Sequence, residues 1–134
     1  MITSYEEALK IAKNYINPNQ LSVIKQLAKG EEGEFFVAKI IEIANVVQAM
    51  PITYQTQNIK DPIAQLHYFT NNCDWYITER DKEPEQLQAF GAANFGNGYE
   101  LGYISIVELL ANNAELDLYY TPVPISKIRK RESN

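Results

Sequence analysis

The sequence has few of the residues that most often build metal centres, disulfides and membrane spans. Its 134 residues include one cysteine, one histidine and one tryptophan. A lone cysteine cannot form an internal disulfide. The longest apolar run, residues 35–50, is interrupted by charged and amide side chains and falls short of the roughly 20 apolar residues of a membrane helix. The first ten residues, MITSYEEALK, lack the basic start and apolar stretch of a signal peptide. These absences predict a cytoplasmic protein that does not cross a membrane.

Basic side chains are also scarce until the chain nears its end. The formal net charge is −5. Residues 1–126 carry 8 basic and 16 acidic side chains, whereas residues 127–134, KIRKRESN, carry 4 basic and 1 acidic. An acidic body disfavours phosphate backbones, so we do not expect it to bind nucleic acid. We expect residues 1–126 to form one domain and residues 127–134 to be a solvated basic tail that adds little to folding.

The hydrophobic residues of the first 50 positions recur with helical spacing. Ser4 and Glu7 form a capping box at the start of the first predicted helix. Asn17, which is followed by proline, marks the start of a second helix. The third predicted helix, residues 31–50, is apolar on more than half of its circumference, so we expect it to be the central one.

Beyond residue 62 the apolar period changes from about 3.6 to 2, which indicates strands. A capping box at Ser105 and Glu108 predicts one short helix before the last strand. Helices followed by strands predict an α+β fold, with the N-terminal helices packed on one face of an antiparallel sheet of about five strands. The predicted strands are residues 63–70, 73–78, 87–93, 99–104 and 114–120.

Two features of the predicted strands concern local geometry. Residues 73–91, CDWYITERDKEPEQLQAFG, carry five acidic and two basic side chains around one proline, and we interpret them as a hairpin with a solvated end. Gly91 and Gly102 lie inside predicted strands, where glycine indicates a bulge or a close approach by another element.

A set of short motifs in the second half of the chain resembles an uncharacterised family of small prokaryotic proteins. Together with the helical stretch GEFFVAKIIEIANVVQAMP, the similar region covers most of residues 30–125. Members of that family occur on plasmids and prophages, alone or as segments of large polyvalent proteins, so the resemblance implies a role in plasmid or phage maintenance or in counter-defence. It implies no catalytic residue. The motifs fall on Tyr68–Thr70, Trp75–Asp81, Phe90 and Gly91, Glu100–Tyr103, and Glu108 and Leu109.

Four residues form the candidate binding surface: Glu79, Asp81, Tyr99 and Glu100. Charges of alternating sign surround Glu79 and Asp81, which is typical of a solvated turn, so we expect both carboxylates at the surface. Glu100 lies between two tyrosines, and we expect a backbone or hydroxyl donor to hold it. If the three carboxylates converged in a pocket, they could instead serve acid–base chemistry.

A zinc or nucleophilic site would depend on His67, Cys73 and Asp74, and an oxygen-only magnesium or calcium site at Glu79 and Asp81 lacks any loop signature. One nitrogen and one sulfur ligand are fewer than zinc sites usually take from protein. A Cys73 nucleophile would need His67 as its activator, whereas the charge of Asp74 disfavours the thiolate. We therefore predict no metal, no cofactor and an inert cysteine.

The aromatic residues of the predicted strands favour a protein partner over nucleic acid. Sheets that stack single-stranded nucleic acid pair aromatic with basic side chains, and this region is acidic. Core packing explains most of these residues, and the others suit a protein-binding surface. They are Phe69, Trp75, Phe90, Tyr99, Tyr103, Tyr119 and Tyr120.

The sequence thus favours a non-catalytic protein-interaction module of a plasmid or prophage. Two alternatives stay open. One is an acidic DNA mimic that inhibits a host nuclease or restriction system, which would need acids regularly spaced on one face. The other is a small carboxylate-dependent hydrolase, which would need two carboxylates in a concave pocket. The sequence gives no basis for an oligomeric state.

Overall fold

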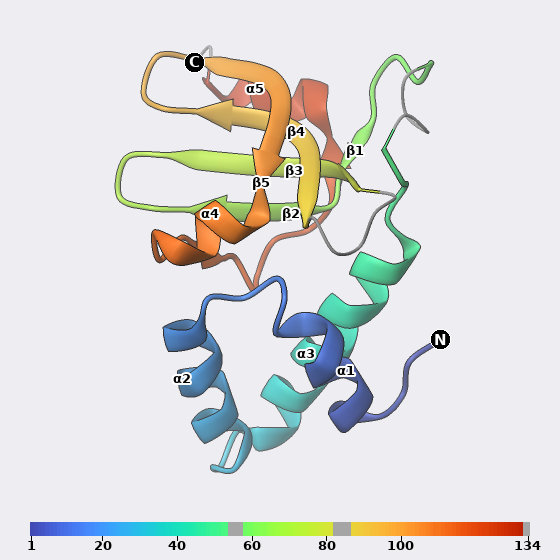
Figure 1. The fold of residues 1–134 in the computed structure, drawn as a ribbon, viewed down its shortest axis with the longest axis vertical. Helices are drawn as coiled ribbons and strands as arrows, with labels where there is room; N and C mark the ends of the chain where they lie inside the picture. The colour runs from blue at the N-terminus through green and yellow to red at the C-terminus, as the bar shows by residue number, and fades with distance from the viewer. Residues whose placement is uncertain (54–57, 82–86, 133–134) are drawn as a thin grey trace.

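The computed structural model describes residues 1–53, 58–81 and 87–132. Its first three helices lie together on one side of a sheet, at the bottom of Figure 1. The predicted caps are confirmed: the Glu7 N–H donates to Ser4 Oγ at 3.3 Å, and the Gln20 N–H donates to Asn17 Oδ1 at 2.8 Å. The helices are α1 (Tyr5–Ala12), α2 (Pro18–Ala28) and α3 (Gly33–Ala49).

The predicted α+β fold with a five-stranded antiparallel sheet is confirmed. The strand order is β5-β4-β3-β2-β6. A short helix, α4 (Ile106–Ala111), follows β5 and begins at the predicted cap, where the Glu108 N–H donates to Ser105 Oγ at 3.2 Å. The strands are β2 (Leu66–Phe69), β3 (Asp74–Arg80), β4 (Gln88–Asn94), β5 (Tyr99–Ser105) and β6 (Glu115–Leu116).

Two predicted strands are shorter than expected. The first splits, because β1 (Ile63–Ala64) leaves the main sheet and pairs with β7 (Val123–Pro124). The last, predicted over residues 114–120, keeps only the two residues of β6. Beyond them the Asp117 side chain accepts from the Tyr119 N–H at 2.9 Å, an Asx-type turn that competes with strand pairing. The hairpin of β3 and β4 is confirmed, while its turn at residues 82–86 lies outside the described residues.

The inner face of the sheet forms the main core with α1, α2 and α3. Leu66, Tyr68 and Ile77 are buried from the sheet side, and Ile40 and Ala44 from α3. Tyr68 is fully buried, and its hydroxyl donates to the Tyr15 carbonyl oxygen in the loop after α1. Burial raises the pKa of Tyr68 well above its ordinary value, so the hydroxyl remains a donor. One side chain thus joins the sheet to the helices.

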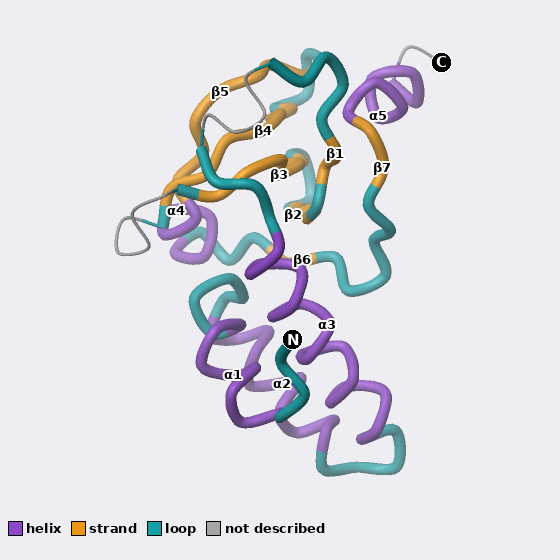
Figure 2. The backbone as a smooth tube through the Cα atoms, turned by 90° about the vertical axis from the view of Figure 1, so that its right-hand side faces the viewer, coloured by secondary structure: helices purple, strands orange, loops and turns teal. Residues whose placement is uncertain are grey.

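The outer face of the sheet is covered by a helix that was not predicted from the sequence. Helix α5 (Ile125–Glu132) lies on the side opposite α4 (Figure 2). Ile125 and Ile128 are buried in a second cluster with Ala92 of β4 and Ala64 of β1. The expectation of a solvated tail is therefore wrong at Ile128, because Ile125 and Ile128 are three residues apart and share one helical face.

The two strand glycines have different environments. Gly91 lies opposite Ile77, next to the register shift of β3, and a Cβ atom there would overlap the carbonyl oxygen of Tyr76. Of the two predicted alternatives, a bulge or a close approach, the close approach is confirmed at Gly91. At Gly102 it is wrong, since a Cβ atom would meet nothing within 4 Å. Gly102 instead leaves an open space beside β5.

Candidate functional site

The four predicted binding residues do not form one surface. Glu79 lies opposite Phe90, which pairs with Tyr103, whereas Glu100 pairs with Ala93 three residues further along β5. Three residues span roughly 10 Å of strand. Glu79 and Glu100 also lie on opposite faces of the sheet, because Tyr103 and Glu100 are an odd number of residues apart.

The burial of the two glutamates is the reverse of the prediction. Glu79 is 4% exposed, so the expectation that its carboxylate lies at the surface is wrong. Glu100, which was expected to be structural, is exposed. Asp81 is half-buried and continues the ladder, its N–H donating to the Gln88 carbonyl at 2.9 Å. Tyr99 is also half-buried and packs edge-on against Tyr76 on the outer face, with ring centroids 5.7 Å apart. Glu100 borders a cavity.

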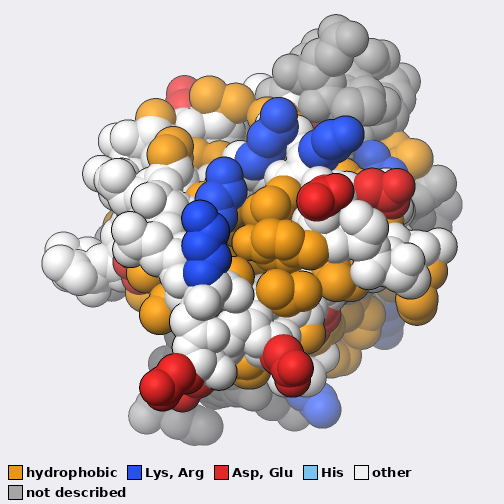
Figure 3. Space-filling model, turned by 90° about the horizontal axis from the view of Figure 1, so that it is seen from below, with side chains coloured by type: hydrophobic (Ala, Val, Ile, Leu, Met, Phe, Trp, Pro, Cys, Tyr) orange, Lys and Arg blue, Asp and Glu red, His pale blue; other side chains and the backbone are white. Residues whose placement is uncertain are grey.

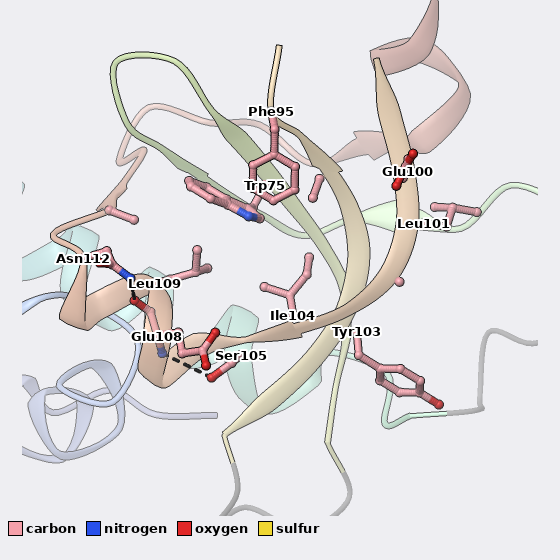
Figure 4. A pocket seen from close by; sticks show the side chains of 13 residues that line it. Trp75, Phe95, Glu100, Leu101, Tyr103, Ile104, Ser105, Glu108, Leu109 and Asn112 are labelled. Atoms are coloured by element: carbon pink, nitrogen blue, oxygen red, sulfur yellow. Dashed lines mark hydrogen bonds between the residues drawn. The ribbon is translucent and has the colours of Figure 1, made fainter. Parts of the chain in front are cut away.

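That cavity is an open pocket of about 390 Å³ on the inner face, lined by residues of β3, β4, β5 and α4. We call it the β5–α4 pocket. In Figure 4, Trp75, Phe95, Ile104 and Leu109 surround a common space, while Tyr103 points away from it. The Trp75 and Phe95 rings meet edge to face, with centroids 5.9 Å apart. Gly102 lies in its wall, which explains why the space beside that glycine is open.

Local sequence explains how the pocket is built. The turn of residues 94–98 places Phe95 beside Trp75, because the Asn94 side chain accepts from the Gly96 N–H at 2.7 Å. The Ser105 cap starts α4 directly after β5, so the helix lies against the end of the strand. As a result, Glu108 joins Glu100 at the pocket, and both carboxylates are exposed. The described lining contains no Lys or Arg, which makes the pocket apolar inside and acidic at its margin.

The sheet edge beside the pocket differs from the opposite edge. At β6 the Gln20 side chain closes the edge: its amide nitrogen donates to the Leu116 carbonyl at 2.8 Å, and its amide oxygen accepts from the Leu116 N–H at 2.9 Å. At β5, which is seven residues long, no described strand pairs with the outer side. Leu101 and Tyr103 are 51% and 60% exposed there.

His67 belongs to a separate cluster on the outer face. Its Nε2 lies 2.7 Å from Asp74 Oδ1, and its Nδ1 lies 3.0 Å from Asp117 Oδ2. The ring stacks on Tyr76 with centroids 4.4 Å apart. Both nitrogens therefore face carboxylates rather than the Cys73 thiol, an arrangement that links three segments of the sheet and does not activate a nucleophile.

The described part of the chain offers neither a cluster of metal ligands nor a membrane-spanning helix. Within residues 1–53, 58–81 and 87–132, no group of three or more His, Cys, Asp or Glu side chains could hold a metal ion. No helix among these residues is long and apolar enough to cross a bilayer.

A second exposed apolar area lies at the helical end of the molecule. Seen from that end, hydrophobic side chains form a patch with a row of Lys and Arg side chains beside it (Figure 3). The exposed large apolar residues of α2 and α3 are Val23, Leu27 and Phe35. This area belongs to helices, so it lacks the strand edge that borders the β5–α4 pocket.

Comparison with known proteins adds no relative. No family model, no curated protein and no solved structure matches this chain. The candidate site therefore depends on its own geometry.

Most of the pocket was not predicted from the sequence. Trp75 was grouped with the strand aromatics that either pack in the core or suit a protein-binding surface, and Glu108 was expected in a helix cap. One signal in the sequence could have indicated the site, because a glycine inside a strand often marks a place where a ligand or another backbone approaches closely. In the structure the Cβ position of Gly102 is open, and its neighbours Leu101 and Tyr103 are exposed.

Proposed function

We propose that this protein is a non-catalytic protein-interaction module that binds its partner through the β5–α4 pocket. The observation that carries the proposal is an open apolar pocket with exposed hydrophobic residues at its border. Phe95 is 65% exposed, and Leu101 and Tyr103 continue the apolar surface around the edge of β5. Exposed apolar area of this kind is typical of an interaction surface.

The openness of the pocket favours a protein over a small molecule. Small-molecule sites enclose most of the ligand surface. Here Phe95, Glu100 and Glu108 are all exposed, so a ligand would remain in contact with solvent on one side. An anchor side chain of a larger partner suits such a site, because the partner itself covers the open side.

The resemblance of residues 30–125 to proteins of plasmids and prophages supports a cytoplasmic role in a mobile element, in maintenance or counter-defence. Partners would then be proteins of the host or of the element. A fragment library from bacterial and plasmid genomes, displayed on phage, samples both.

The test uses three baits: the wild type, Gly102→Leu and Ala38→Leu. Leucine at residue 102 introduces a side chain in the pocket wall, and its Cβ atom meets nothing within 4 Å. Ala38 is exposed on α3 and provides a matched control. We expect fragments to be enriched on the wild type and on Ala38→Leu but not on Gly102→Leu. Enrichment of the same fragments on all three baits would exclude the pocket, and no enrichment on any bait would count against an interaction module.

A further inference from the structure

The outer edge of β5 has a regular set of backbone groups that point away from the sheet. The Ile106 N–H donates to the Leu87 carbonyl at 3.0 Å, and the same register pairs Gly102 with Gly91. Hydrogen-bonded pairs alternate along an antiparallel ladder. The backbone groups of Gly102 therefore point toward β4, and those of Leu101 and Tyr103 point toward the outer edge.

Gly102 connects this edge with the pocket. A strand added outside β5 would meet Gly102 as a non-hydrogen-bonded pair, the position where opposing side chains approach most closely. Since Gly102 has no side chain and its Cβ position is open, a side chain of the added strand can pass over it into the β5–α4 pocket. A bulky side chain at position 102 would occupy this route.

The charge of the pocket specifies that side chain. Glu100 and Glu108 border the cavity, and its described lining has no Lys or Arg. Trp75 offers an aromatic surface that attracts a cation. A Lys or Arg side chain matches all three groups, because its aliphatic stem suits the apolar wall and its charged end suits the carboxylates.

We propose that an extended segment of a partner protein pairs with the outer edge of β5 and inserts a Lys or Arg side chain over Gly102 into the β5–α4 pocket. This inference rests on the proposed interaction function and defines the chemistry of the partner. Backbone pairing provides the affinity of such strand addition, and the pocket provides its specificity.

The experiment selects tryptophan-free ten-residue peptides from a random display library on the wild-type protein. Trp75 is the single tryptophan of the chain and lines the pocket, so its fluorescence measures the affinity of each synthesised peptide. We expect the selected peptides to alternate β-branched residues around a Lys or Arg. N-methylation of backbone nitrogens on the side facing β5 should weaken binding about tenfold or more, and N-methylation on the other side should not.

Protein variants test the same geometry. Leu101→Pro removes an N–H that points to the outer edge and spares the hydrogen bonds to β4, whereas Leu101→Ala keeps that N–H. Only the proline variant should therefore lose about tenfold or more in affinity for the selected peptides. The double variant Glu100→Gln with Glu108→Gln should lose a similar factor and much of its salt dependence. If Leu101→Pro does not fold, the N-methylated peptides test the strand pairing without it.

Several results would overturn the inference. Selected peptides without a basic residue, or peptides that tolerate N-methylation on both sides, would exclude basic strand addition. A wild-type dimer in sedimentation equilibrium that Leu101→Pro dissociates would assign the edge to a second copy of the chain. Ligands lost with Gly102→Leu but retained with Leu101→Pro would leave the interaction function intact and refute only the strand pairing.

Discussion

The contrast between Gly91 and Gly102 gives a direct test of the local geometry on which the site depends. Both glycines lie in neighbouring strands and pair with each other. Neither has a positive φ, so alanine is compatible with the backbone at both positions. The difference between the two alanine variants should therefore come from space alone.

At Gly91 a Cβ atom would overlap the carbonyl oxygen of Tyr76, and the next contacts are also backbone atoms. A side chain cannot rotate away to relieve this overlap, so β3 and β4 would have to separate. We expect Gly91→Ala to lower the free energy of unfolding by about 3 kcal/mol, the upper part of the range for overpacking. At Gly102 nothing lies within 4 Å, and we expect Gly102→Ala to raise it by about 0.5–1 kcal/mol through the reduced entropy of the unfolded chain.

The assay is urea unfolding of the wild type and both variants, followed by Trp75 fluorescence and by circular dichroism. Coincident transitions by the two probes would establish two-state behaviour, which the comparison requires. Equal destabilisation by the two alanines would refute the reasoning, because it would mean that Gly102 is also in close contact. An unaffected Gly91→Ala variant would refute the close approach of β4 to the backbone of Tyr76.

Three other changes follow from the described contacts. Ile128→Ala should lower the free energy of unfolding by about 2–5 kcal/mol, because Ile128 lies on the buried face of α5 and is 1% exposed. An unchanged melting temperature would show that this helix does not dock on the sheet. Cys73→Ser should reduce stability by at most about 1–2 kcal/mol and leave peptide affinity unchanged, since the thiol is only half-buried; loss of binding in a folded variant would contradict this. The Ser126 hydroxyl and N–H lower the pKa of Asp61, so the stabilisation is present above about pH 4 and is lost as the pH falls through the lowered pKa. In an NMR titration, Ser126→Ala should raise the pKa of Asp61. An unchanged pKa would show that the Ser126 hydroxyl does not donate to Asp61.

The sequence predicted the parts of the fold that depend on local rules. At each of the caps Ser4, Asn17 and Ser105, the side-chain oxygen accepts from the N–H three residues later. The residue types and their spacing are visible in the sequence. The change of hydrophobic period likewise marked the boundary between helices and sheet, because strand alternation follows from burial of one face. Strands β2 to β5 pair in chain order, as expected of a meander, whereas the pairing of β6 with β2 joins distant segments and was not predicted.

The errors concern residues whose environment depends on distant segments. Glu79 lies in a charged stretch, yet it is buried, because the packing of other segments rather than the local charge pattern decides its exposure. The C-terminal residues resemble a basic tail since only Ile125 and Ile128 are apolar, and the cluster that receives them comes from β1 and β4. Glu100 was expected to be held in the structure, whereas it borders a cavity whose lining comes from β3, β4, β5 and α4, an arrangement that only the folded chain shows.

The two edges of the sheet explain why the accessible surface lies at β5. Natural sheets protect an exposed edge with short strands, with lysine or proline, or with a covering element. β6 has two of these protections, since it is two residues long and the Gln20 side chain bonds to Leu116 in place of a strand. β5 is seven residues long, contains no lysine or proline, and carries a single charged residue, Glu100. Among the described residues no strand pairs with the outer side of β5, and in the proposed function a partner strand covers this edge. The charge of Glu100 then has a physical role, because it disfavours acidic and purely apolar strands and favours a basic one.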